Sequence, residues 1–141
     1  MQNFVINVEA AIHKNGKWLV GIRSKKEAHA GGLLSFVGGV VEHTDPLVST
    51  LESAVIREVK EEIDLEVKVI DFVNDTLFVS QKGNRVINMV FLCEVVSGEA
   101  KITHTEEMES LLWLTTEEIL NFPHVPKWLC ESVKIAGNKI S

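Results

Sequence analysis

The chain has 141 residues, of which 45% are hydrophobic and 24% are charged. These values are ordinary for a soluble globular protein, and the length suits one domain with its own core, which we expect to span residues 1–141. The formal net charge of −6 argues against binding to bulk nucleic acid or to an anionic membrane, because both require a basic surface. It does not exclude a small anionic substrate whose charge is screened by a metal ion.

The sequence has no recognisable targeting or membrane segment. The N-terminal residues lack the basic stretch and long apolar run of a signal peptide, and no stretch is long enough to span a bilayer. Cys93 and Cys130 are far apart and fit no CxxC pattern, so we expect reduced thiols. These features predict a cytoplasmic protein.

Apolar and polar residues alternate along the first segment, which Asn15-Gly16 follows with the composition of a tight hairpin turn. The expected strands are residues 4–12, 17–23, 33–41, 65–73, 75–80, 85–96 and 111–114, with a short extension at 98–102. The expected helices are a central one ending with the segment 57–62 (REVKEE), a small one from 115 or 116 that Pro123 stops, and a final one at 126–136. This mixture predicts an α/β sandwich of the α+β type around a mixed sheet.

The start of the central helix has two interpretations. Asp45 and Pro46 could supply the N-cap and the first helical residue, or Ser49 or Thr50 could cap a later start, with Ser49 and Glu52 at capping-box spacing. The later start is favoured, because Glu52 would otherwise interrupt an apolar stripe along the helix. That stripe consists of Val48, Leu51, Val55, Val59 and Ile63.

Three carboxylates, Glu58, Glu61 and Glu62, crowd the last turn of this helix, where the helix dipole is already negative. Glu58 and Glu62 are also a like-charge pair at spacing i,i+4, which costs roughly 0.2–0.5 kcal/mol in an isolated helix. A hard divalent cation would remove both conflicts, and oxygen ligands of this kind suit Mg²⁺ or Mn²⁺. Arg57 can hold Glu61 through an i,i+4 ion pair while the other carboxylates bind metal.

The segment 39–65 resembles the Nudix box, the signature of hydrolases that cleave nucleoside diphosphates linked to another group. The matching residues are Gly39, Arg57, Glu58, Val59, Glu61, Glu62, Ile63 and Leu65. The preceding segment 35–39, Glu42 and the later strand with Trp113 are similar to further features of the family. The resemblance implies a Nudix-like α/β/α sandwich with a mixed β-sheet.

Four features depart from the family pattern. Asp45 stands where a glutamate is expected, four residues are inserted between Asp45 and Arg57, Asp64 replaces a glycine, and Val37 replaces a proline. Aspartate visits the left-handed region better than most residues, so Asp64 should be tolerated. We expect the insertion to lengthen the loop at residues 43–48 and not to shift the helix. The departures therefore bear on substrate fit more than on metal binding.

The resemblance also implies roles for individual residues. It assigns metal binding to Glu58, Glu61, Glu62 and the backbone of Gly39, and substrate binding to Arg23, Gly38 and Gly39, since glycine lets the backbone approach phosphate closely. The implied catalytic residues are Arg57, Glu58, Glu61, Glu62 and Glu107. The general base varies in the family between a box glutamate and one on a later loop, where Glu106 and Glu107 are the candidates here.

The implied function is Mg²⁺- or Mn²⁺-dependent hydrolysis of a pyrophosphate bond in a small nucleotide-like substrate. A homodimer is also expected, because many related proteins are dimers. Two alternatives stay open: a Nudix-like module that binds a nucleotide without turnover, and a scaffold domain without metal affinity. Trp18, Phe36 and Phe78 could stack on a base, although core packing is the default. Glu9 could reach the pocket or face solvent.

Overall fold

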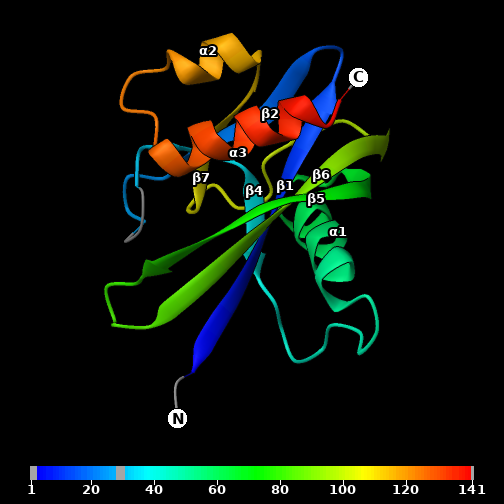
Figure 1. The fold of residues 1–141 in the computed structure, drawn as a ribbon, viewed down its shortest axis with the longest axis vertical. Coiled ribbons are helices and arrows are strands. Elements are labelled where there is room, and N and C mark those ends of the chain that lie inside the picture. The colour runs from blue at the N-terminus through cyan, green and yellow to red at the C-terminus, as the bar shows by residue number, and fades with distance from the viewer. Residues whose placement is uncertain (1–2, 28–30, 141) are drawn as a thin grey trace.

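The computed structural model describes residues 3–27 and 31–140. Within these residues it forms one mixed seven-stranded sheet and three helices (Figure 1). The elements are β1 (Phe4–Lys14), β2 (Lys17–Arg23), β3 (Leu34–Ser35), β4 (Val37–Val40), α1 (Thr50–Ile63), β5 (Glu66–Val79), β6 (Arg85–Ser97), β7 (Met108–Leu114), α2 (Thr116–Leu120) and α3 (Lys127–Asn138). The expected sandwich of helices around a mixed sheet is confirmed.

The sheet is built around β1, which changes its partner along one edge. The strand order is β3-β2-β1-β6-β5, with β4 also paired to β1 and β7 to β2. On one side β1 runs parallel to β6. On the other it pairs with β2 through His13 and Lys14, and with β4 from Asn7 to Ala10. Consequently the Gly38-Gly39 pair lies directly beside β1.

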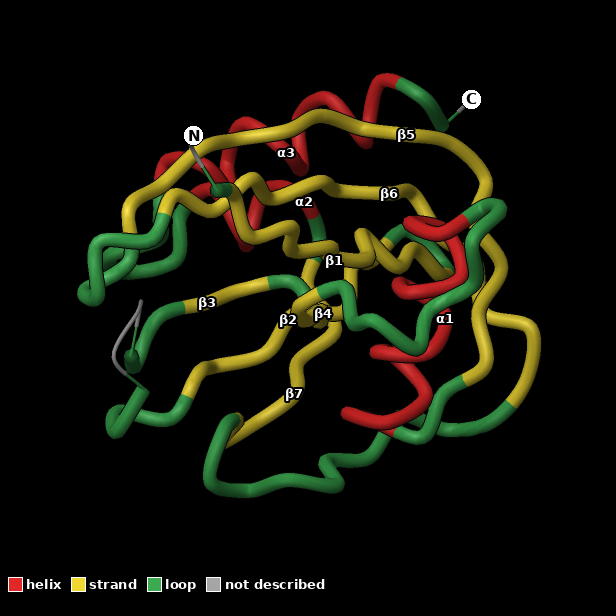
Figure 2. Tube along the Cα trace, turned by 90° about the horizontal axis from the view of Figure 1, so that it is seen from below, coloured by secondary structure: helices red, strands yellow, loops and turns green. Residues whose placement is uncertain are grey.

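Two cores separate the sheet from its helices, and α1 and α3 lie on opposite sides of it (Figure 2). Alternation along β1 explains this arrangement, because successive side chains of a strand point to opposite faces. The core on the α1 side contains Val8, Ala10, Ile12, Val55, Val59 and Ile63. The core on the α3 side contains Ala11, Val90, Leu92, Leu129 and Val133. Among the described helices, none combines the length and apolarity that crossing a membrane requires.

The favoured late start of α1 is confirmed, but the expected capping box is wrong. Ser49 is the N-cap residue and has φ 55° and ψ 40°, in the left-handed region, without a side-chain cap bond. A capping side chain normally depends on an extended backbone at this position. The hydroxyl of Thr50 instead donates to the carbonyl of Pro46 at 2.6 Å. Val48 precedes the helix and is 79% exposed, so the apolar stripe begins at Leu51.

Three strand boundaries differ from expectation. Residues 33–41 form two strands that are interrupted at Phe36, and the glycine pair lies inside β4. Residues 65–73 and 75–80 form the single strand β5, whose register shifts against β6 between Val69 and Asp71 and between Phe72 and Asn74. Such bulges absorb extra residues without ending a strand. β7 begins at Met108, earlier than residue 111.

The expected extension at 98–102 is not a strand. Its backbone groups are used on α1 instead: the N–H of Lys101 donates to the carbonyl of Ile63 at 2.9 Å, and that of Thr103 to Glu62 at 3.0 Å. These bonds satisfy carbonyls that a helix end leaves without partners. They also fasten the loop that follows β6 to the acidic end of α1.

Both C-terminal helices begin where the sequence indicates. Thr115 caps α2 and forms a capping box with Glu118. Pro126 precedes α3 as its N-cap residue. The expected tolerance of Asp64 is likewise confirmed, since this residue ends α1 in the left-handed conformation, with φ 54°.

Candidate active site

A cavity of about 460 Å³ lies where β4, the end of α1 and the loop before β7 meet. Among the described residues, seven glutamates line it: Glu9, Glu27, Glu42, Glu58, Glu61, Glu62 and Glu107. So many carboxylates around one space repel one another and would repel an anionic ligand. The cavity is therefore suited to phosphate groups only in the company of cations.

Arg57 donates hydrogen bonds to three carboxylates and forms a longer ion pair with a fourth, Glu42, at 3.7 Å. Its Nη1 donates to Oε1 of Glu58 at 2.8 Å and to Oε2 of Glu61 at 3.1 Å, so the expected pair with Glu61 is present. Its Nε and Nη2 donate to the two carboxylate oxygens of Asp45 at 2.7 and 2.9 Å. Nη2 also reaches the carbonyl of Val40 at 3.3 Å. One guanidinium thus joins α1, the end of β4 and the long loop between them.

Asp45 has a structural contact that the sequence did not reveal. Its carboxylate is buried, accepts a bidentate bond from Arg57 and also accepts the backbone N–H of Glu42 at 2.7 Å. The Arg57 bonds, followed by the Glu42 bond, hold the pKa of Asp45 below its ordinary value. The insertion accordingly lies in the loop after β4, with Leu47 fully exposed, while α1 keeps its place against the glycine pair.

Glu58 and Glu62 have raised pKa values for related reasons. Burial raises the pKa of Glu58, and the bond from Arg57 opposes this rise. Burial also raises the pKa of Glu62, to about 8, together with a hydrogen bond to Glu107 and the charges of Glu107, Glu58 and Glu61. Carboxyls this close favour sharing a proton when no cation is present.

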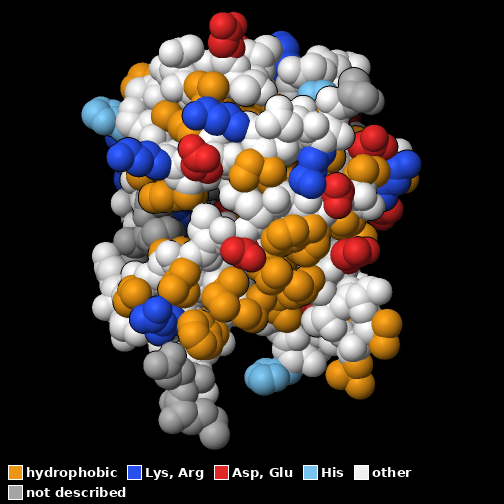
Figure 3. Space-filling model, in the orientation of Figure 1, with side chains coloured by type: hydrophobic (Ala, Val, Ile, Leu, Met, Phe, Trp, Pro, Cys, Tyr) orange, Lys and Arg blue, Asp and Glu red, His pale blue; other side chains and the backbone are white. Residues whose placement is uncertain are grey.

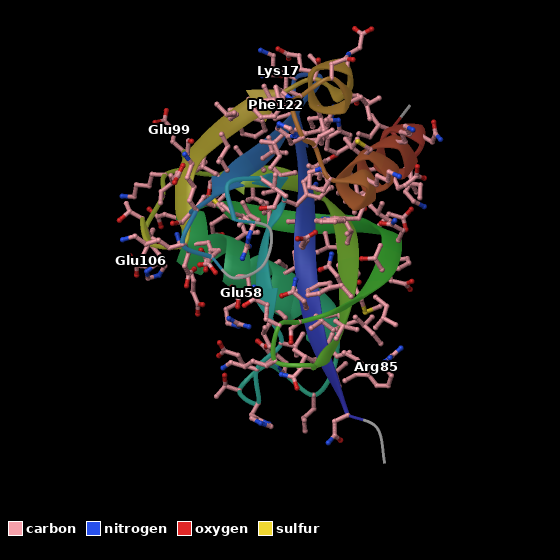
Figure 4. The ribbon with its side chains drawn as sticks, turned by 90° about the vertical axis from the view of Figure 1, so that its left-hand side faces the viewer. Lys17, Glu58, Arg85, Glu99, Glu106 and Phe122 are labelled. Atoms are coloured by element: carbon pink, nitrogen blue, oxygen red, sulfur yellow. The ribbon has the colours of Figure 1, made fainter. Side chains whose placement is uncertain are left out.

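The two loop glutamates are placed differently. Glu107 lines the cavity and hydrogen-bonds to Glu62. Glu106 is exposed and points outward at the edge of the molecule, whereas Glu58 lies further in on α1 (Figure 4). The loop is fixed by Thr103, whose hydroxyl donates to the carbonyl of Glu62 at 2.8 Å. Both loop glutamates are exposed, and Glu107 is the one that lines the cavity.

The remaining residues singled out from the sequence divide between cavity and core. Arg23 lines the cavity and pairs with Glu27 at 3.4 Å. Glu9 lines it too and accepts a hydrogen bond from Asn88 at 2.9 Å, so it faces the pocket. Trp18 is buried in the core, at 1% exposure, whereas Phe36, at 2% exposure, also forms part of the cavity wall. Asn7 and His104, which the sequence did not single out, also line the cavity.

The carboxylates of the cavity fit a hard cation that takes its remaining ligands from water or substrate and not from the protein. Within residues 3–27 and 31–140, no three His, Cys, Asp or Glu side chains are grouped as a ready-made metal cage. Mg²⁺ usually binds through one or two carboxylates and completes its shell with water and substrate phosphates. The absence of a Cβ at Gly39, beside the Glu58 carboxylate, leaves the backbone open to such an ion.

The family model that describes the NUDIX domain matches residues 5–129. The chain belongs to the NUDIX family. The resemblance seen in the helical half of the motif is thereby confirmed, and with it the assignment to Nudix-type hydrolases. No curated protein matched the chain.

Solved structures share this NUDIX fold over nearly the whole chain. A MutT protein from Methanosarcina mazei Go1 is 24% identical with a TM-score of 0.80, covering 98% of this chain and 96% of its own. The MutT NUDIX hydrolase from Burkholderia pseudomallei is 22% identical with a TM-score of 0.76, covering 99% and 100%. The NUDIX domain of Shewanella oneidensis NrtR, complexed with ADP ribose, is 17% identical with a TM-score of 0.77, covering 100% and 91%.

The two glycines of the NUDIX motif have different neighbours, which predicts different effects of substitution. A Cβ at Gly38 would overlap the backbone carbonyl of Val8, whereas a Cβ at Gly39 would overlap the carboxylate of Glu58. Backbone atoms in a sheet cannot move aside, so Gly38→Ala should destabilise the fold by about 1–3 kcal/mol. Gly39→Ala should displace Glu58, lowering kcat about tenfold with a smaller loss of stability.

Thermal unfolding and steady-state kinetics of both variants test this prediction, with Gly83→Ala as a remote glycine control in the β5–β6 turn. Gly83 has φ 85° and no atom near the position of a Cβ, so its substitution affects backbone conformation alone. The prediction would be contradicted if Gly38→Ala and Gly39→Ala lost the same amount of activity for the same loss of stability.

Proposed function

We propose that the chain is a Mg²⁺- or Mn²⁺-dependent hydrolase that cleaves a pyrophosphate bond in a small nucleotide-like substrate, with residues 1–141 acting as one domain. The observation that carries this proposal is the acidic cavity beside the glycine pair, where Glu58, Glu62 and Glu107 converge. The fold shared with MutT proteins supports it. The complex of one NUDIX neighbour with ADP ribose supports a nucleotide-like ligand.

Glu58, Glu61 and Glu62, with the backbone of Gly39, would hold the cation. A bound Mg²⁺ would neutralise pyrophosphate oxygens and lower the pKa of a water molecule to make it a nucleophile. Arg57 would keep the carboxylates oriented through the hydrogen bonds that it donates to Glu58 and Glu61. The resting hydrogen bonds thus prepare the site before a ligand arrives.

Glu107 would act as the general base. It faces the cavity from the loop before β7 and hydrogen-bonds to Glu62 across it. A base must stand within hydrogen-bond reach of the water proton that it accepts, and the position of Glu107 in the cavity wall would allow this. Arg23, at the end of β2, would contact a phosphate that projects from the cavity.

The test is product release from a panel of nucleoside triphosphates, ADP-ribose, dinucleotide polyphosphates and sugar nucleotides. Turnover should need Mg²⁺, stop with EDTA and return when Mg²⁺ is added in excess. Glu62→Gln should lower the rate at least tenfold, since it removes a charged ligand. Glu52→Gln, an exposed glutamate in the first turn of the same helix, is the matched control and should keep the parent rate.

Equal rates for Glu62→Gln and the parent protein would remove the role assigned to Glu62. Tight nucleotide binding without turnover across metals and pH would replace the hydrolase by a binding module. The cytoplasmic location and the homodimer stay predictions. Figure 3 shows an apolar surface over the strands, where a second copy would be sought. Phe4 and Val79, which both pair with Arg85 in the sheet, are exposed apolar residues at 43% and 58%.

A further inference from the structure

The loop at residues 98–107 joins β6 to β7 and crosses the C-terminal end of α1 (Figure 2). Ala100 and Ile102 are partly buried and pack against the core on the α1 side. At its other end the loop is held to the residue after β2, because the N–H of Ser24 donates to the carbonyl of Glu107 at 2.9 Å. The loop that carries the proposed general base is therefore attached at both ends.

Thr103 makes the closest attachment of this loop to α1. Its backbone N–H donates to the carbonyl of Glu62 at 3.0 Å, and its hydroxyl donates to the same carbonyl at 2.8 Å and to the carbonyl of Glu61. A hydroxyl has one hydrogen, so the two carbonyls share it, as is common at helix ends. Two donors of one residue thus meet on the backbone of Glu62, a proposed metal ligand.

The backbone bonds around Thr103 complete the end of α1. A helix leaves its last four carbonyls without partners inside the helix. In α1 the first of these, on Lys60, accepts the N–H of Asp64 at 3.0 Å. The carbonyls of residues 61–63 all accept from the loop, and the one on Ile63 takes the N–H of Lys101 at 2.9 Å. The loop therefore supplies the partners that the helix end needs.

An ion pair adds to this attachment but contributes little. Asp64 stands where the family pattern has a glycine, and its carboxylate pairs with Lys60 at 3.1 Å and with Lys101 at 3.5 Å. The Lys101 side chain is 71% exposed, and exposed ion pairs stabilise a fold only weakly. The hydrogen bonds of Thr103 consequently carry most of the attachment.

The chain between Thr103 and Glu107 is short and closed. The N–H of Glu107 donates to the carbonyl of His104 at 3.2 Å, which folds these residues into a turn. Glu107 then lines the cavity and hydrogen-bonds to Glu62. Thr103 is not among the described residues that line the cavity, so any effect on the reaction must pass through the loop. Its contacts fix where the turn that bears Glu107 begins.

We propose that Thr103 is a positioning residue, whose hydroxyl holds the loop 98–107 against α1 and thereby sets the position of Glu107 relative to Glu62. Thr103 touches neither the substrate nor the reacting atoms and acts through Glu107. The proposal rests on the proposed function for the role of Glu107. It extends that function to a residue outside the NUDIX motif segment 39–65, and it assigns a purpose to an exposed hydroxyl that water could otherwise satisfy.

Amide hydrogen exchange of the metal-free full chain tests the attachment without turnover. Thr103→Val keeps the shape of the side chain and removes the hydroxyl, whereas Thr103→Ser keeps the hydroxyl. The amides of Lys101 and of residue 103 should exchange about tenfold faster in Thr103→Val, because one hydrogen bond that closes the loop is lost. The amide of Val59, inside α1, should not change. Thr103→Ser should match the parent protein.

Kinetics with and without Glu107 separate positioning from a merely structural role. Thr103→Val should lower kcat about tenfold and leave KM unchanged, since a small displacement of a reacting group is costly and the hydroxyl is outside the cavity. In the Glu107→Gln background, Thr103→Val should cause no further loss, because the residue that it positions is already disabled. Thr115→Val, which removes the capping hydroxyl of α2, is the matched control and should keep the parent kcat.

Unchanged exchange of the loop amides in Thr103→Val would overturn the attachment. The same fold loss of kcat with and without Glu107 would assign the hydroxyl to the fold and overturn its link to Glu107, and so would a parent kcat in Thr103→Val. Failure of the proposed function appears elsewhere, as an absence of Mg²⁺-dependent turnover by the parent protein in the substrate panel. Hydrogen exchange would still decide in that case whether Thr103 holds the loop.

Discussion

Replacing Arg57 by alanine is expected to lower kcat/KM about 100-fold, the upper range for residues that orient metal ligands. Arg57 donates to Glu58, Glu61 and Asp45, so its removal frees two proposed metal ligands and the loop at once. Without the guanidinium, the carboxylates lose the positive charge that offsets their repulsion. Steady-state kinetics at saturating Mg²⁺, together with thermal unfolding, measure both consequences.

Arg57→Lys separates charge from geometry. A lysine keeps the positive charge but cannot bind Asp45 through two parallel bonds, so we expect a loss of activity between those of the parent and the alanine variant. Arg85→Ala is the matched control, because Arg85 lies over the ring of Phe4, away from the acidic cavity. Arg57→Ala with parent activity would show that the carboxylates do not depend on this residue.

The parts of the site that the sequence predicted are those set by local spacing. Arg57 and Glu61 are one helical turn apart, so a helix brings them together whatever surrounds it. The apolar stripe predicted the late start of α1. The backbone freedom of aspartate predicted that Asp64 would be tolerated at the end of the helix. Each of these features depends on residues that are close together in the sequence.

The parts that the sequence missed depend on chain segments that are far apart. Asn88 is 79 residues from Glu9, and the two meet only because β1 and β6 are parallel neighbours. Asp45 reaches Arg57 across a long loop whose path no local pattern specifies. Thr103 is 41 residues from Glu62, and its bonds to the end of α1 are visible only in three dimensions. The sequence did not show which distant segments lie side by side, or in what register distant strands pair.

Glu62→Gln is expected to stabilise the metal-free protein at alkaline pH. Burial and the Glu107 hydrogen bond raise the pKa of Glu62 to about 8 in the folded state, against an ordinary value of 4.5. A carboxyl with a raised folded pKa contributes its full stability below 4.5 and loses it as the pH rises through 8. Because the side chain is only half-buried, solvent screening limits the difference at pH 9 to about 1–2 kcal/mol.

The measurement is the free energy of unfolding of the parent protein and of Glu62→Gln in EDTA, at pH 5 and pH 9. The two proteins should be nearly equal at pH 5 and should diverge at pH 9, where the parent protein carries the extra charge. Glu52→Gln should follow the parent protein at both pH values, since Glu52 is exposed and lies at the other end of α1. A constant difference between pH 5 and pH 9 would contradict the raised pKa.

Magnesium should reverse this order of stability. A ligand at 100 times its Kd stabilises the folded state by about 2.7 kcal/mol, provided that the unfolded chain does not bind it. The parent protein, with both Glu58 and Glu62 charged, should gain most of this free energy at pH 9, while Glu62→Gln should gain less. The charge that destabilises the free protein would then be the charge that binds the cation. If both proteins gained equally, the cation would bind at a place that does not include Glu62.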